Sequence, residues 1–198
     1  PSLVVLVARK GVIVLEEAFG ILRPSDNTPL RTDSIFPVMS TCKPVTAAAV
    51  LCLVEDGLLS LKHPITDYLT EITAAGADQV LIADLMTHTS GYDDWDVYPH
   101  AISRRKAKHP IPAAAPGQHP LTNSLIHYAA DAPLTGRPGE AMCYCNFSYE
   151  LLADIVRRVS GRPFAEFVDA RIFKPLGMND SAFILTPGAR TRSSTAGP

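Results

Sequence analysis

The chain has 198 residues, of which 46% are hydrophobic and 19% charged, and its formal net charge is −2. This length and balance fit one globular domain with a core of its own, or most of a larger one. The cationic cluster at residues 104–108 is short, so we expect no nucleic acid as a partner. The apolar run at residues 47–54 is too short to span a bilayer. Because the chain opens with Pro1, no signal peptide can be read and the compartment stays open.

The first twenty residues predict a β-hairpin. Residues 3–8 and 12–15 are apolar and rich in β-branched side chains, and Arg9-Lys10-Gly11 joins them. Phe19 and Gly20 extend the second strand. A two-stranded ribbon of this kind needs further strands or helices to cover its faces. Residues 23–34 then predict a polar loop.

The rest of the chain reads mainly as helices. Pro44 fits only the first turn of a helix, which fixes a helix start near Ser40, and Gly57 ends that helix. The long segment at residues 92–120 predicts irregular structure, and residues 186–198 predict a disordered tail. The expected helices cover residues 40–56, 83–88, 121–130, 147–160 and 163–172.

The four cysteines give little support for a metal centre or a disulfide. The spacing C-x-x-C that is typical of zinc sites is absent from the sequence. We interpret the cysteines as small buried hydrophobic side chains, and we expect neither a metal nor another cofactor.

The motif that carries chemistry is Ser40-Thr41-Cys42-Lys43, directly before an apolar helix. Residues three apart on a helix share a face, so the Ser40 hydroxyl would lie beside the Lys43 amine. A desolvated lysine can act as or support a base for a serine nucleophile, and a helix N-terminus favours a developing oxyanion. The pattern S-x-x-K alone is weak, since chance produces it about once in 250 residues.

Two other short motifs resemble catalytic motifs, but a surface segment and a turn explain them better. Ser103-Arg104-Arg105-Lys106 is also S-x-x-K, but its adjacent cations predict a solvated surface segment. Residues 25–27 spell S-D-N, a motif of one β-lactamase class, yet they precede Ser40 and fit ordinary turn chemistry.

Tyr144-Cys145-Asn146 is the better partner for the serine and lysine. A tyrosine near a lysine can take up the serine proton and return it to a leaving group. The amide of Asn146 can orient Lys43 or a substrate carbonyl. The alternative interpretation is a helix entrance with Asn146 as N-cap.

These blocks, together with LMTHTSGY at residues 85–92 and the segment 139–178, resemble the penicillin-recognising serine hydrolases. The branch they are similar to holds class C β-lactamases, D-Ala-D-Ala carboxypeptidases and related esterases. The resemblance covers residues 1–185 and implies an α+β fold, in which an antiparallel sheet backed by helices forms a three-layer sandwich with a helical subdomain. Within it, residues 1–38 would supply the first hairpin and residues 39–185 the mostly helical part.

The resemblance also implies roles for particular residues. Ser40 matches the acylated nucleophile, Lys43 its activating lysine, Tyr144 the general base and acid, and Asn146 the polar, substrate-binding partner. His88 and Gly91 match a family block whose role is expected to be structural.

Two features depart from the family pattern. Cys42 stands where threonine is usual, and the third motif, a Lys/His-x-Gly on a strand beside the site, is missing before Pro198. The resemblance therefore implies the N-terminal part of a hydrolase, either as a fragment, as the product of a truncated gene or as one member of a split pair.

Two hypotheses follow from the sequence. The first is an enzyme that forms an acyl-enzyme with a small ester, β-lactam or peptide substrate. The second is a non-catalytic family member that binds a peptide or partner, or self-associates, through its unpaired sheet edge.

Overall fold

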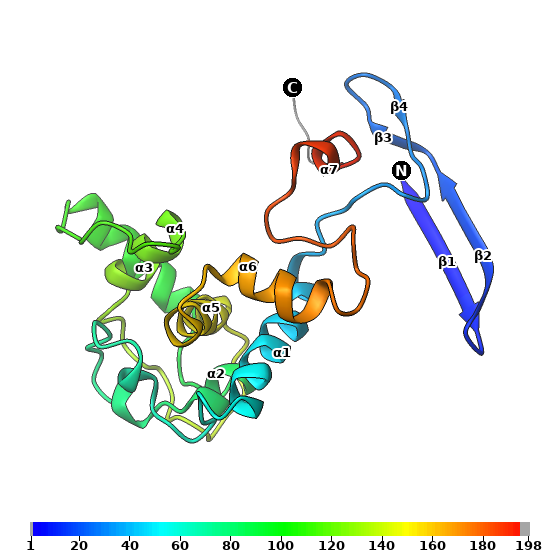
Figure 1. The fold of residues 1–198 in the computed structure, drawn as a ribbon. Helices are drawn as coiled ribbons and strands as arrows, with labels where there is room; N and C mark the ends of the chain where they lie inside the picture. The colour runs from blue at the N-terminus through cyan, green and yellow to red at the C-terminus, as the bar shows by residue number, and fades with distance from the viewer. Residues whose placement is uncertain (1, 195–198) are drawn as a thin grey trace. The chain divides into compact units, whose positions relative to one another are not determined.

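The computed structural model describes residues 2–194, which fall into two compact units. Of the described residues, the strand unit comprises 2–40 and 178–194, and the helical unit comprises 41–177. The order of the elements along the chain can be followed by colour in Figure 1. Mixed helices and small antiparallel sheets agree with the predicted α+β class.

The predicted hairpin forms the main sheet of the strand unit. Strands β1 (Leu3–Arg9) and β2 (Val12–Phe19) are antiparallel, and Lys10 and Gly11 turn the chain with positive φ angles. The register shifts at a bulge between Val7 and Ala8. Apolar side chains on this ribbon remain exposed, namely Leu3, Leu6, Val7, Val12, Ile13, Val14, Leu15 and Phe19.

The segment predicted as a polar loop contains a second small sheet. Strand β3 (Ile21–Arg23) pairs with β4 (Thr28–Pro29). The Asp26 carboxylate accepts a hydrogen bond from the Thr28 backbone N–H at 2.9 Å, and Asn27 has a positive φ of 54°. This is the turn chemistry that residues 25–27 predict, and it brings the two strands together.

The C-terminal segment also departs from the prediction. Helix α7 (Pro187–Thr191) lies where a disordered tail was expected, and the Thr186 hydroxyl caps it by accepting from Ala189 N at 3.2 Å. Ser193 bridges to Ile35, with Ile35 N donating to Arg192 O at 2.8 Å. These backbone bonds explain why residues 178–194 belong with the hairpin rather than with the helices. Residues 195–198 of the predicted tail lie outside the described residues.

Helix α1 (Cys42–Glu55) opens the helical unit after the 3-10 turn η1 (Met39–Thr41). Its start lies close to the position predicted from Pro44, which occupies the first turn. Gly57 follows the helix with a φ of 71°. On the buried side, Ala49, Val50 and Leu53 join the core.

Helix α5 (Asn146–Ser160) is the central element of the helical unit, and it packs against α1, α2 and α4. Its apolar stripe was predicted, and Leu151, Leu152, Ile155 and Val156 are fully buried. The remaining elements are η2 (Ile65–Asp67), η3 (Ala77–Gln79), α2 (Ile82–Thr87), α4 (Pro120–Tyr128), α6 (Phe164–Val168) and the π-helical turn η4 (Asp169–Phe173).

The prediction that residues 92–120 are irregular is wrong for its first half. Helix α3 (Asp94–Lys106) occupies this region, with Asp93 as N-cap accepting from Trp95 N at 2.9 Å. Pro99 lies inside the helix, and only Val97 and Ala101 of its residues are buried. Ser103 of the second S-x-x-K lies exposed in the last turn of this helix, so the surface interpretation is right although the segment is helical.

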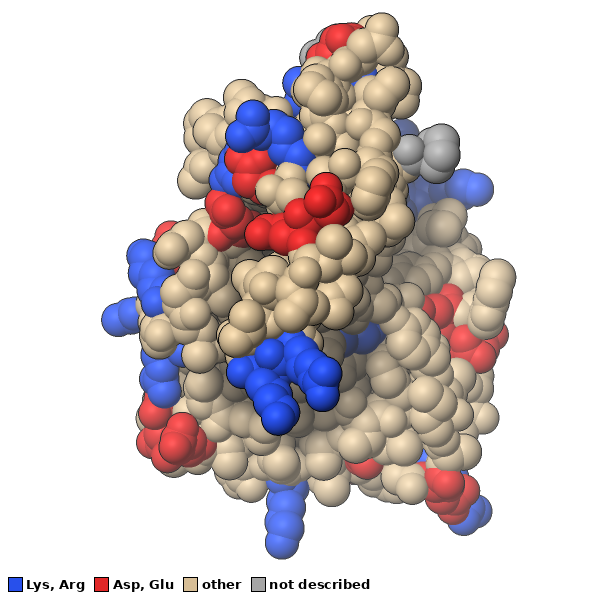
Figure 2. Space-filling view, turned by 90° about the vertical axis from the view of Figure 1, so that its right-hand side faces the viewer, with Lys and Arg blue, Asp and Glu red and all other residues tan. Residues whose placement is uncertain are grey.

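On the face shown in Figure 2, cationic and anionic groups are intermixed among uncharged residues. Among residues 2–194, none of the helices has both the length and the apolarity to cross a bilayer.

Candidate active site

Ser40 and Lys43 lie at the entrance to α1. Ser40 is an exposed residue of η1, and Lys43 follows it in the first turn of α1, three residues later in the chain. The backbone of Thr41 is already helical, with φ −65° and ψ −14°, so the turn runs directly into the helix. The helix therefore begins next to Ser40, where Pro44 predicts its start.

The Lys43 amine lies in a half-buried polar and aromatic environment. Its Nζ donates a hydrogen bond to Asn146 Oδ1 at 2.7 Å. It also lies 4.8 Å from the ring centroid of Tyr144 and 5.5 Å from that of Tyr149, close enough for cation–π attraction. The structure thus brings Lys43 next to Tyr144 and Asn146, although Asn146 lies 103 residues further along the chain.

Asn146 is the first residue of α5, and its amide is held from two sides. Oδ1 accepts from Lys43, while Nδ2 donates to the Asp94 carboxylate at 2.7 Å. Asp94 also accepts the backbone N–H groups of Asn146 and Phe147, at 2.8 and 3.1 Å. Asn146 therefore does not act as the N-cap that the alternative interpretation proposed, because Cys145 precedes the helix as its N-cap.

Tyr144 is 45% exposed and lies in a segment that His88 holds at both ends. The His88 carbonyl accepts from Cys143 N at 2.7 Å, and its ring Nδ1 accepts from Cys145 N at 3.1 Å. The ring itself packs on Tyr144 with 4.5 Å between centroids. Tyr144 is thus fixed by backbone contacts on both sides and by an aromatic neighbour.

His88 ends α2 in the left-handed conformation, with φ 59°. Desolvation, and then the nearby positive charge of Lys43, lower the pKa of His88, and its Nδ1 must remain unprotonated to accept the Cys145 N–H. Gly91 forms the adjacent turn, where a Cβ would lie 2.3 Å from the Gly136 carbonyl oxygen. The expected role of this block, a helix end and a turn, agrees with these contacts.

Sequence reasoning did not link two residues to the contacts they make at the site. Asp94 was assigned to an irregular region, and the expected turn role of His88 did not include its hydrogen bond from Cys145 N. A signal for Asp94 exists in hindsight, since an acidic residue near a helix start is a common cap, but nothing local links it to Asn146.

The cysteines take no part in this arrangement as a pair. All four carry free thiols, and Cys145 is buried beside Asp94, where burial raises the pKa of its thiol to about 12. Within residues 2–194, no cluster of His, Cys, Asp and Glu side chains is suited to hold a metal ion.

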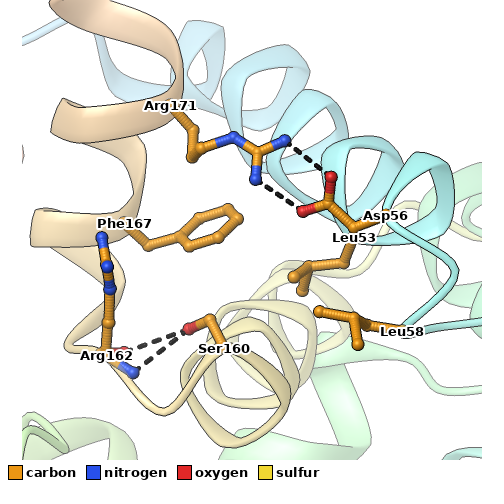
Figure 3. A pocket seen from close by; sticks show the side chains of 7 residues that line it. All are labelled: Leu53, Asp56, Leu58, Ser160, Arg162, Phe167 and Arg171. Carbon is orange, nitrogen blue, oxygen red and sulfur yellow. Dashed lines mark hydrogen bonds and ion pairs between the residues drawn. The ribbon is translucent and has the colours of Figure 1, made fainter.

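A cavity of about 260 Å³ lies elsewhere in the helical unit. Figure 3 shows its apolar floor of Leu53, Leu58 and Phe167 and the paired Arg171 and Asp56 at its edge. These residues belong to the C-terminal ends of α1 and α5 and to α6–η4, whereas Lys43 and Asn146 begin α1 and α5. A helix of fifteen residues is about 20 Å long, so this cavity is separate from the candidate site.

Comparison with known proteins finds relatives that are named as an esterase and as a carboxypeptidase/endopeptidase. It is 35% identical over 187 residues to esterase EstB of Burkholderia gladioli, covering 91% of this chain and 46% of the relative. It is 25% identical over 173 residues to the D-alanyl-D-alanine-carboxypeptidase/endopeptidase AmpH of Escherichia coli K12, covering 86% and 42%.

A solved structure agrees in fold. The octameric penicillin-binding protein homologue from Pyrococcus abyssi superposes with a TM-score of 0.72 at 27% identity, covering 90% of this chain and 40% of that one. The chain thus spans less than half the length of each of these three proteins. The family model described as beta-lactamase matches residues 1–197, and the chain belongs to the beta-lactamase family.

Proposed function

We propose that this chain carries the catalytic group of a serine hydrolase that acts on an ester or amide through an acyl-enzyme. Ser40 is the nucleophile, Lys43 and Tyr144 handle its proton, and Asn146 orients Lys43 and the substrate. The observation that carries the proposal is the Lys43 amine, bonded to Asn146 and 4.8 Å from the Tyr144 ring, in the first turn of the helix that Ser40 precedes.

The chemistry assigned to these groups is balanced within the site. Ser40 Oγ attacks the carbonyl carbon while its proton passes to the Lys43–Tyr144 pair. The same proton goes to the leaving alcohol or amine as the carbonyl–heteroatom bond breaks. Water then attacks the acyl-enzyme by the reverse sequence. The positive end of the α1 dipole favours the oxyanion that forms at each step.

The relatives support the general class and leave the substrate open within it. The printed names of EstB and AmpH describe an esterase and a carboxypeptidase/endopeptidase. We include short-chain esters, D-Ala peptides and β-lactams in the proposed substrate class, and a short-chain ester is the first to test because EstB has the higher identity of these two.

A second candidate function is a non-catalytic binding module, and the hairpin favours it. Its exposed apolar side chains, such as Val12 at 63% and Val14 at 62%, are suited to contact with another chain. In that case the site residues would persist without acylation.

Stoichiometric labelling separates the two candidates without requiring turnover. The 198-residue chain is incubated with a fluorophosphonate probe, and the adduct is located by peptide mass spectrometry. We expect one equivalent on Ser40, abolished in Ser40→Ala and unchanged in Ser103→Ala, which removes the serine of the second S-x-x-K. A label on Ser103, or no label on an otherwise folded chain, would reject the enzymatic proposal.

A further inference from the structure

Asp94 makes an unusual set of contacts for the first residue of a helix. Its carboxylate accepts hydrogen bonds from the start of a different helix, α5, which lies 52 residues further along the chain. Oδ1 accepts from Asn146 N at 2.9 Å and Phe147 N at 3.1 Å, and Oδ2 accepts from Asn146 Nδ2 at 2.7 Å. The Cys145 thiol donates to Oδ1 at 3.2 Å. One side chain thus satisfies both the backbone of α5 and the side chain of Asn146.

The chemistry of these groups fixes which way the Asn146 amide faces. A carboxylate only accepts hydrogen bonds, whereas an amide donates at its nitrogen and accepts at its oxygen. The NH₂ end of Asn146 must therefore face Asp94, which leaves Oδ1 as the end that accepts from Lys43 Nζ at 2.7 Å. If the amide were reversed, an acceptor would face the carboxylate and a donor would face the amine.

From this arrangement we propose that Asp94 is a positioning residue for acyl transfer: it fixes the amide of Asn146, and through it holds the Lys43 amine beside Tyr144. This inference rests on the proposed roles of Lys43 and Tyr144. Asp94 itself touches no reacting atom, and it acts only through Asn146.

An asparagine at position 94 cannot do the same work. Its amide keeps one accepting oxygen, but its NH₂ end then faces donors at the start of α5. Asn146 loses the partner that distinguishes its two ends. The negative charge at the positive end of α5 is lost as well.

The test compares Asp94→Asn with Asp96→Asn in the 198-residue chain. Asp96 is an exposed acid in the same turn of α3, so the control makes the same change in charge and in side-chain shape. The rate of Ser40 labelling by the fluorophosphonate is separated into reversible binding and covalent phosphonylation, in which fluoride leaves and which takes the place of acylation with this probe. We expect Asp94→Asn to slow acylation by about 10- to 100-fold, as a misplaced group does, with reversible binding unchanged. Asp96→Asn should label like wild type.

A double-mutant cycle with Asn146→Ala separates positioning from support of the fold. If Asp94 acts through Asn146, then Asp94→Asn adds no further loss of acylation when Asn146 is already alanine. Thermal unfolding of all four proteins reports the separate effect on α5. An equal loss in both backgrounds would show a structural cap alone and overturn the proposal, as would wild-type acylation in Asp94→Asn.

NMR of the Asn146 side-chain amide tests the positioning role of Asp94 even if Ser40 proves unreactive. In ¹⁵N-labelled chain, the side-chain NH₂ of Asn146 should show one proton with slowed exchange, bonded to Asp94. Asp94→Asn should shift both NH₂ signals and remove that protection, and Asp96→Asn should not. Absence of Ser40 labelling in wild type would reject the proposed function, whereas unchanged Asn146 signals in Asp94→Asn would reject the positioning role.

Discussion

Helix α5, which begins with Asn146, carries a buried ion-pair network, and we predict that this network stabilises the helical unit. Asp154 is 2% exposed, and its carboxylate accepts from Arg157 Nε at 2.6 Å and from Arg158 Nε at 2.8 Å. Arg158 extends the network to Glu71 and to the Tyr68 carbonyl. We predict that Asp154→Ala destabilises the helical unit far more than loss of an exposed acid.

The magnitude follows from burial. Removal of one partner of a buried ion pair costs about 3–5 kcal/mol because the other charge stays buried without it. Arg158 retains Glu71, and the side chains of Arg157 and Arg158 are 13% and 28% exposed, so the lower end of that range applies. With a urea m value of about 2 kcal/mol/M, a loss of about 3 kcal/mol lowers the midpoint by about 1.5 M.

Urea unfolding followed by far-UV circular dichroism measures this shift. The control is Asp169→Ala, because Asp169 pairs with Lys174 on the surface and should cost less than about 1 kcal/mol. A midpoint change for Asp154→Ala no larger than that of Asp169→Ala would refute the reasoning.

The same network predicts a dependence on pH. Burial alone raises the pKa of Asp154, but hydrogen bonds from Arg157 and Arg158 outweigh it and hold the pKa below its usual value. A carboxyl with a lowered pKa in the folded state contributes its full stability above the unfolded pKa of about 3.9, and loses it as the pH falls through the folded value. The difference between wild type and Asp154→Ala should therefore shrink in acid.

Three further predictions concern the site and the hairpin. Lys43→Arg keeps the charge but should slow Ser40 labelling by at least about 100-fold, because a guanidinium does not deprotonate; near-normal labelling would contradict this role. Burial and Lys43 lower the pKa of His88, so its stabilising contribution is complete above about pH 6.5 and declines as the pH falls below it. Between pH 7.5 and 5.0, the melting temperature of His88→Asn should fall less than that of wild type. An equal fall in both proteins would refute this contribution of His88. Val14→Lys should reduce self-association of the 198-residue chain in sedimentation velocity, and an unchanged distribution would argue against the hairpin as the contact.

The helices that the sequence predicted best are those whose ends or buried face are marked by residues within the helix or next to it. Pro44 and Gly57 bracket α1, and the stripe from Leu151 to Val156 marks the buried face of α5. In each case the signal depends on neighbours within a few turns. Such signals survive in a single sequence because they need no knowledge of what packs against them.

Helix α3 shows why some helices are not predicted from local sequence signals. It contains Pro99, several charged side chains and only two buried apolar residues, Val97 and Ala101, so neither propensity nor periodicity indicates a helix. Its start is stabilised by Asp93, and Arg104 near its end pairs with Asp131 at 2.7 Å. The cap is a local contact, whereas the Arg104–Asp131 pair is a tertiary contact that no pattern within the helix indicates.

In the candidate site, too, some residues could be predicted from local sequence and others could not. Tyr-x-Asn and S-x-x-K each depend on short spacing before a helix, and from them Lys43, Tyr144 and Asn146 could be proposed together. What orients them comes from α2 and α3: His88 holds the segment around Tyr144, and Asp94 holds the amide of Asn146. These partners lie more than fifty residues from the groups they contact, and a lone histidine or aspartate has no pattern that names its partner. A short motif can therefore indicate which candidate residues lie near one another, whereas their orientation depends on contacts that only the folded chain provides.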